Sequence, residues 1–73
     1  MRWLMVEVFK TDVQRQPEAE KLVAALQQLL PGSKINFDLE DCDKILRVEA
    51  DDVRAEKIAE VVQAKGYWCE VLE

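Results

Sequence analysis

Histidine is absent from this sequence of 73 residues, and glycine, proline and cysteine occur only twice each. The lack of histidine removes the commonest general base at neutral pH. The sequence also has no serine or cysteine placed beside such a base, and no glycine-rich loop that could hold a phosphate group. We therefore expect a protein that is not an enzyme.

An excess of basic residues is missing as well. The chain has ten lysines and arginines against fifteen acidic residues, which gives a net charge of -5. Proteins bind nucleic-acid backbones mainly through basic side chains that displace counterions. Nucleic acid is therefore not expected as a partner.

Long hydrophobic runs are also lacking, because Glu7 and Lys10 interrupt the first apolar stretch. We accordingly expect neither a membrane span nor an export signal, and no membrane partner. Two cysteines without such a signal are typical of a reducing compartment, where thiols are usually free. The sequence thus predicts a cytoplasmic protein.

No proline-, glycine- or serine-rich stretch and no internal repeat divides the chain, so we expect one domain over residues 1–73. A chain of this length buries only roughly 60% of the surface that its unfolded form exposes. Small domains therefore often depend on a metal ion, a disulfide or a second subunit for additional stability.

Two strands and a helix are predicted in the first half of the sequence. Residues 3–10 are β-branched and aromatic enough for a central strand that is apolar on both faces. Pro17 suits the first turn of a helix, and Pro31 with Gly32 ends it. Charged and apolar residues alternate over residues 34–40, as in an edge strand. The apolar stripe of the helix comprises Ala19, Leu22, Val23, Leu26, Leu29 and Leu30.

The second half of the sequence predicts a hairpin turn over residues 41–43 and a third strand over residues 45–50. Asp51 and Asp52 are expected to cap a second helix, which ends at Gly66. The last strand covers residues 67–72. The apolar stripe of the second helix comprises Ala55, Ile58, Val61 and Val62.

The order of elements, βαββαβ, predicts the ferredoxin-like α+β fold. Its four-stranded antiparallel sheet has the strand order 4-1-3-2, and both helices cover the same face. Alternation along each strand assigns one set of side chains to that face and the other set to the open face. The predicted inward set comprises Leu4, Val6, Val8, Ile35, Phe37, Leu39, Leu46, Val48, Tyr67, Cys69 and Val71.

The segment from Ile58 to Tyr67, Ile-Ala-Glu-Val-Val-Gln-Ala-Lys-Gly-Tyr, resembles the second helix and the Gly-Tyr turn of heavy-metal-associated domains. Such domains occur in copper chaperones and metal-transporting ATPases. Less specific similarities lie in the strand ending at Val8, in the helix with Ala25 and Leu26, and in residues 36–40. The resemblance covers nearly the whole chain and implies the same ferredoxin-like fold.

Heavy-metal-associated domains hold soft ions through a GMxCxxC motif between the first strand and the first helix. The resemblance places the two cysteine positions of this motif at Arg15 and Glu18, and its methionine position at Val13. None of the three is a soft ligand, and Arg15 is a permanent cation that repels metal ions. We therefore expect a degenerate member that holds no metal and no other cofactor. Ligand-sensing domains of the ACT type have the same fold and are an alternative.

Cys42 and Cys69 are the two thiols of the chain. The predicted topology separates their backbones by about 10 Å, at roughly 4.8 Å per strand, which is too far for a disulfide. Cys69 alternates with Tyr67 and Val71 and is expected to fill the core. Cys42 is expected to be exposed and a poor nucleophile, because the aspartates on either side oppose the thiolate. Soft-metal or redox chemistry at Cys42 and Cys69 is a further alternative function.

Apolar side chains are also predicted on the open face of the sheet, where they would form a patch that monomers seldom leave exposed. Tryptophan is the residue most enriched at the binding hot spots of interfaces. We therefore expect a non-catalytic module that works by contact with protein, most simply as a homodimer. The predicted interface comprises Trp3, Met5, Phe9, Ile45, Trp68 and Leu72.

Overall fold

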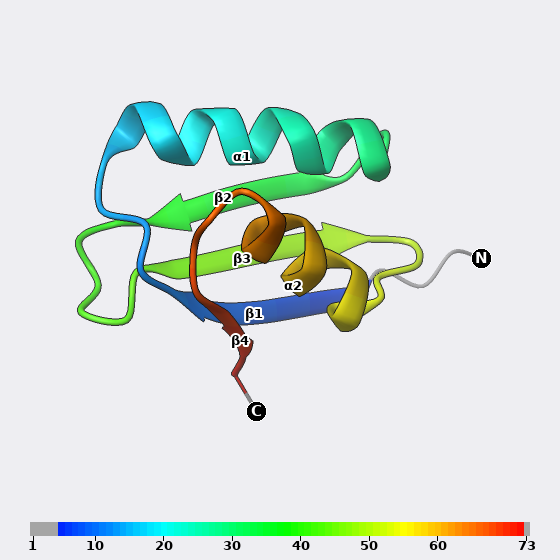
Figure 1. Ribbon diagram of the computed structural model, residues 1–73. Helices are drawn as coiled ribbons and strands as arrows, with labels where there is room; N and C mark the ends of the chain where they lie inside the picture. Colours follow the sequence, from blue (N-terminus) through cyan, green and yellow to red (C-terminus); the bar gives the residue numbers. More distant parts are fainter. Residues whose placement is uncertain (1–4, 73) are drawn as a thin grey trace.

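The fold is a four-stranded antiparallel sheet with two helices on one face, as shown by a computed structural model that describes residues 5–72 (Figure 1). The strand order is β2-β3-β1-β4, which is the predicted order read from the opposite edge. The predicted ferredoxin-like α+β fold is confirmed. Within the described residues, neither helix has the length and apolar character needed to cross a membrane. The elements are β1 (Met5–Thr11), α1 (Gln16–Leu29), β2 (Lys34–Asp38), β3 (Ile45–Ala50), α2 (Ala55–Ala64) and β4 (Cys69–Val71).

β1 is one of the two inner strands of the sheet, in agreement with the prediction of a central strand from its apolar sequence. It pairs with β3 over residues 5–9 and with β4 over residues 9–11. β4 is shorter than predicted, because the backbone N–H of Trp68 donates to the Asp12 carboxylate in the preceding loop instead of joining the sheet. At its other end β4 reaches Val71, which lies opposite Phe9, so among the described residues the first part of β1 pairs only with β3.

α1 agrees with its predicted limits. Pro17 lies in the first turn, where a backbone nitrogen needs no intrahelical partner. Ala19, Leu22 and Leu26 of the predicted stripe are buried against the sheet. Leu29, the last residue of the helix, was predicted in the same stripe but is 45% exposed.

α2 begins later than predicted. Its N-cap residue is Arg54, so the prediction that Asp51 and Asp52 cap this helix is wrong. The reason lies in Val53, which is buried in the core and moves the start of the helix beyond the two aspartates. Gly66 ends the helix as predicted, with a φ of +96° that glycine adopts without steric cost.

The turn between β2 and β3 is stabilised by its own side chains. The Lys44 ammonium donates a 2.7 Å hydrogen bond to the carbonyl of Leu39, and the backbone of Lys44 adopts a left-handed conformation with a φ of 47°. The backbone N–H of Asp43 donates to Oδ1 of Asp41 at 2.8 Å. β2 lies at an edge of the sheet, as its alternating charges predict.

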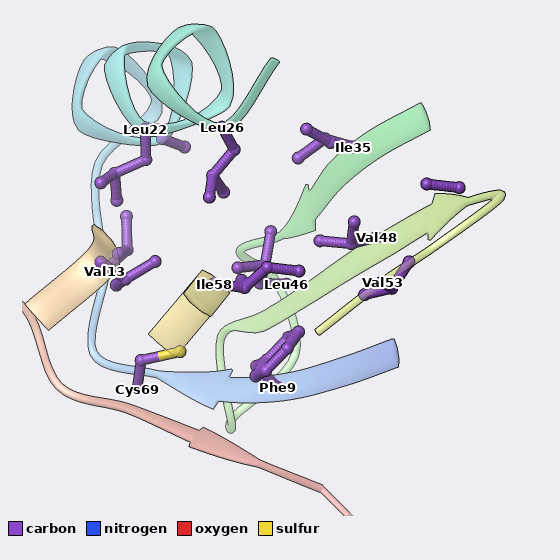
Figure 2. Packing of buried hydrophobic residues seen from close by; sticks show 13 residues of the cluster. Phe9, Val13, Leu22, Leu26, Ile35, Leu46, Val48, Val53, Ile58 and Cys69 are labelled. Atoms are coloured by element: carbon purple, nitrogen blue, oxygen red, sulfur yellow. The ribbon is translucent and has the colours of Figure 1, made fainter. Parts of the chain in front are cut away.

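The core lies between the sheet and the two helices, and every helix and strand contributes to it (Figure 2). Ile35, Leu46 and Val48 point inward as predicted. The cluster of buried residues comprises Phe9, Val13, Ala19, Leu22, Leu26, Ile35, Leu46, Val48, Ala50, Val53, Ile58, Val62 and Cys69.

The face that β1 turns toward the helices is the opposite of the predicted one. Phe9 is fully buried, whereas Val6 is 43% exposed. The register explains this, because Phe9 lies opposite the buried Leu46. Alternation could not select the face, since β1 is apolar on both sides, and burial of the larger aromatic ring removes more apolar surface from water. Leu4, predicted to point inward, lies outside the described residues.

Candidate interaction surface

The loop between β1 and α1 is where the resemblance would place a metal site. Val13 is fully buried in the core, and Arg15 is the exposed N-cap residue of α1. Glu18 is half-buried and accepts a hydrogen bond from Tyr67. Over residues 5–72, none of these three side chains belongs to a cluster of potential metal ligands. The loop is used for packing and hydrogen bonding.

Two hydrogen bonds join this region to the turn after α2. The Tyr67 hydroxyl donates to Oε2 of Glu18 at 2.9 Å, and the backbone N–H of Trp68 donates to Oδ1 of Asp12 at 2.8 Å. The hydrogen bond to Glu18 raises the pKa of Tyr67, and burial and the negative charges of Glu18 and Asp12 act in the same direction. The two bonds fix the backbone just before β4, and with it the position of Trp68.

Thr11 joins the same loop to the β2–β3 turn. Its hydroxyl donates a 2.6 Å hydrogen bond to the carbonyl of Lys44 and accepts one from the backbone N–H of Val13 at 3.3 Å. Its own backbone N–H donates to the carbonyl of Asp43 at 3.0 Å. Thr11 lies one residue beyond the predicted strand over residues 3–10, but it is the last residue of β1 and is buried.

The two cysteines are free, and their placement agrees with the prediction. Cys42 is exposed and Cys69 is buried. Burial raises the pKa of Cys69 from 9.0 to about 11, which disfavours its thiolate. The ligand atoms of Asp41, Cys42 and Asp43 lie within 4.8 Å of one another, and Cys69 is not part of that group. The structure therefore does not bring the two thiols into one cluster of ligands.

The predicted interface residues divide between the two faces of the sheet. The prediction for Phe9 is wrong, because this residue is fully buried under the helices. Met5 is 42% exposed, but its register with Ala50 places it on the helix-covered side. Trp3 lies outside the described residues. Ile45 is half-buried on the open face, where it lies opposite Asp38.

Trp68 and Leu72 are the predicted interface residues that are most exposed on the open face, at 49% and 40%. The N–H of Leu72 donates to the carbonyl of Val8, so the side chains of Leu72 and Val8 lie side by side on the open face. Val6 is exposed on the same face. The reversed orientation of β1 therefore replaces Phe9 and Met5 by Val6 and Val8. We call Val6, Val8, Trp68 and Leu72 the open-face patch.

Charged residues border the open-face patch. Lys10 lies opposite Glu70 across β1 and β4, and Arg47 lies opposite Val8 across β1 and β3. Glu49 lies opposite Val6. By register, the Lys10–Glu70 pair lies between Trp68 and the pair formed by Val8 and Leu72, so Trp68 is separated from the other apolar residues of the patch by one pair of opposite charges.

Two grooves lie where helices meet the edges of the sheet. One, of about 310 Å³, lies between α1 and β2. The other, of about 600 Å³, lies between α2 and the side of β1 next to β4. The lining of the larger groove comprises Glu7, Ala55, Glu56, Ala59, Val71 and Leu72.

Comparisons with known proteins give no relative from which a function could be read. No protein-family model matches the chain, and neither the curated proteins nor the solved structures give a significant match. The likeness to heavy-metal-associated domains stays a prediction from the sequence, and the functional argument rests on the geometry of the residues described above.

Proposed function

We propose that this chain is a non-catalytic interaction module, and that its open-face patch binds a second copy of the chain. The observation that carries the proposal is the exposure of Val6, Trp68 and Leu72 on the face that the helices do not cover. Burial of such apolar side chains is the main favourable term in protein association. A second subunit would also supply the stabilisation that a small core provides only in part.

The loop between β1 and α1 supports a function without metal. We propose that the chain derives from a heavy-metal-associated scaffold in which Arg15 and Glu18 have replaced the thiolates. Glu18 serves as a hydrogen-bond acceptor for Tyr67 instead. Together with the bond from Trp68 to Asp12, this contact positions the largest side chain of the open-face patch.

Light scattering coupled to size-exclusion chromatography tests the proposal. We expect a dimer at micromolar concentration and a Trp68→Ala variant whose dissociation constant is about 30-fold higher, since loss of a hot-spot residue costs about 2 kcal/mol. Leu29→Ala is the matched control, because Leu29 is similarly exposed at the end of α1. A wild-type protein that stays monomeric over the accessible concentrations contradicts the proposal.

A second candidate function is soft-metal binding at the β2–β3 turn. The proximity of the ligand atoms of Asp41, Cys42 and Asp43 favours it. Asp41 already accepts a hydrogen bond from the backbone of Asp43, which competes with a metal ion for that oxygen. Titration with Zn(II) or Cu(I) tests this candidate: binding by the wild type that Cys42→Ser abolishes supports it, and equal, negligible binding by both proteins ends it.

A further inference from the structure

β2 has unused backbone hydrogen-bonding groups on the side that faces away from β3. The carbonyl of Val8 bonds to the chain at the end of β4, so Arg47, which lies opposite Val8 on β3, bonds away from β1 and toward β2. Its partner on β2 is Asn36. Ile35 and Phe37, on either side of Asn36, therefore direct their N–H and C=O groups to the free edge of the sheet.

The free edge of β2 lies far from both ends of the described chain. Among residues 5–72, only β3 pairs with β2, and Figure 1 shows β2 at the border of the sheet, next to α1. The described chain begins at Met5 in β1 and ends at Leu72 beside β4, so both ends lie on the other side of β3. The segments that lead into and out of β2 are described, and neither pairs with its free edge.

The sequence of β2 is complementary to itself when two copies run antiparallel. With Asn36 of one copy opposite Asn36 of the other, Lys34 lies opposite Asp38, and Ile35 lies opposite Phe37. Ile35 and Phe37 then exchange backbone hydrogen bonds, because both direct these groups to the free edge. The oppositely charged residues occupy the positions without backbone hydrogen bonds, where cross-strand side chains are closest.

Other alignments of two β2 strands are less favourable. A parallel pair places Lys34 opposite Lys34 and Asp38 opposite Asp38, and like charges directly opposite each other are destabilising. An antiparallel pair shifted by two residues extends beyond the strand on one side. In one direction it needs the carbonyl of Leu39, which already accepts a hydrogen bond from the Lys44 ammonium. The charges that protect this edge from other chains therefore select one register between copies.

The two charged side chains are available for such pairing. Lys34 and Asp38 are both exposed. Within residues 5–72, no hydrogen bond or ion pair reaches the side chain of Lys34. Oδ1 of Asp38 accepts a 3.2 Å hydrogen bond from the N–H of Glu40, which leaves Oδ2 for a lysine of another copy. Each pair of copies would form this contact twice, because the arrangement has twofold symmetry.

The groove of about 310 Å³ between α1 and β2 lies along the same edge. Val23 and Phe37 are half-buried apolar residues in its lining, and Ala24 leaves space on the helix side. The twofold axis passes through Asn36 and stands perpendicular to the sheet, so the helices of both copies cover the same face. The two grooves then face each other, and pairing removes the exposed parts of Val23 and Phe37 from water.

We propose that β2 joins two copies of this chain edge to edge into one continuous antiparallel sheet, with Lys34 of each copy paired to Asp38 of the other. The interface lies across β3 from the open-face patch, so the two proposals stand or fall separately. A chain that uses both surfaces assembles beyond the dimer as its concentration rises, because each surface pairs with its own kind.

Charge reversal tests the proposed register, in a Trp68→Ala background that weakens association through the open-face patch. Sedimentation equilibrium measures the dissociation constant between copies. We expect Lys34→Glu and Asp38→Lys each to raise it about 10-fold, because two attractive pairs become repulsive. An equimolar mixture of the two variants should associate about 10-fold more tightly than either variant alone, because each substituted side chain again lies opposite a charge of the other sign.

Lys57→Glu and Glu60→Lys are the matched controls. Both residues are exposed on α2, and the two substitutions change the net charge by the same amounts as the two reversals in β2. Neither control should weaken association to a comparable degree, and their mixture should gain no affinity. Circular dichroism shows whether each variant keeps the fold.

The backbone contacts have a test that needs no change in β2. In Trp68→Ala protein, the amides of Ile35 and Phe37 should gain protection from hydrogen exchange as the concentration rises, because their N–H groups enter the shared ladder. The amide of Asn36 bonds to β3 in either state and should change little. Contacts between labelled and unlabelled copies should join the α-protons of Asn36, since this pair lies on the axis at the closest backbone spacing.

Three results would overturn the proposal. The first is a mixture of the two reversal variants that associates no more tightly than either variant alone. The second is exchange of the Ile35 and Phe37 amides that does not depend on concentration, and this measurement decides the question if a reversal variant unfolds. The third is a set of contacts between copies that places Asn36 opposite a different residue. None of these results bears on the open-face patch, whose own test follows Trp68.

Discussion

The hydroxyl of Tyr67 donates a 2.9 Å hydrogen bond to Oε2 of Glu18, across 49 residues of sequence. The likeness to heavy-metal-associated domains places the second metal thiolate at the position of Glu18. In this chain the same position holds the turn after α2 against the first turn of α1. A contact that stabilises the backbone before Trp68 therefore lies at the position where that likeness would expect a ligand.

Alkaline pH should weaken the fold through Tyr67. Its pKa is raised in the folded protein, so its contribution to stability is fully present below pH 10 and is lost as the pH rises through the folded-state pKa. We expect the thermal midpoint to fall in this range, and Tyr67→Phe to reduce the fall. Tyr67 is the only tyrosine, so its ionisation can be followed directly by ultraviolet absorbance.

The control for this experiment concerns Cys69, whose pKa of about 11 gives it the same alkaline dependence. The thermal midpoint is therefore measured in two proteins, Cys69→Ala alone and Cys69→Ala combined with Tyr67→Phe. An identical pH dependence of the two proteins contradicts a role for the bond from Tyr67 to Glu18.

Cys69 should react slowly with thiol reagents. A rise of its pKa from 9.0 to about 11 lowers the thiolate fraction at neutral pH by about 100-fold, and burial blocks access as well. A Cys42→Ser variant leaves Cys69 as the single thiol, and its labelling rate is compared with and without denaturant. Equal rates in folded and unfolded protein would show that Cys69 is not buried.

Thr11→Val should destabilise the domain by about 1–3 kcal/mol, because it leaves the carbonyl of Lys44 and the N–H of Val13 without the Thr11 hydroxyl. The two side chains have nearly the same shape, so the change removes hydrogen bonds and little else. Thr11→Ser, which keeps the hydroxyl, is the matched control in urea unfolding. A serine variant that loses more stability than the valine variant would assign the role of Thr11 to packing.

Phe9→Ala should cost about 3–5 kcal/mol, because it opens a cavity in the core. Val6→Ala should change the free energy of unfolding by about 0.5 kcal/mol or less in the monomer, because Val6 is exposed. Urea unfolding at a concentration below dimer formation measures both. If Val6→Ala costs more stability than Phe9→Ala, then Val6 and not Phe9 lies in the core, which contradicts the orientation of β1 described above.

The limits of sequence reasoning are visible in β1. The helices, the β2–β3 hairpin and the strand order follow from periodicity and turn residues, and the structure has all of them. The orientation of β1 does not follow, because Val8 and Phe9 are both apolar and the pattern has no preferred face. The prediction assigned the alternating side chains of β1 to the wrong faces. For this reason Phe9 was predicted in the interface, although it lies in the core.

The candidate site was predictable to a smaller extent. Trp68 and Leu72 are exposed as predicted, since β4 alternates clearly around Cys69. The roles of Thr11 and Glu18 were missed, because their partners are 33 and 49 residues away and no local pattern signals such contacts.

Nuclear Overhauser contacts between isotope-labelled and unlabelled copies show directly whether the open-face patch joins two copies of the chain. A dimer through this patch should give contacts between copies from the methyl groups of Val6, Val8 and Leu72, together with the indole of Trp68. Contacts that arise only from Val23 and Ile35, beside the groove between α1 and β2, would contradict it, as would the absence of any contact between copies.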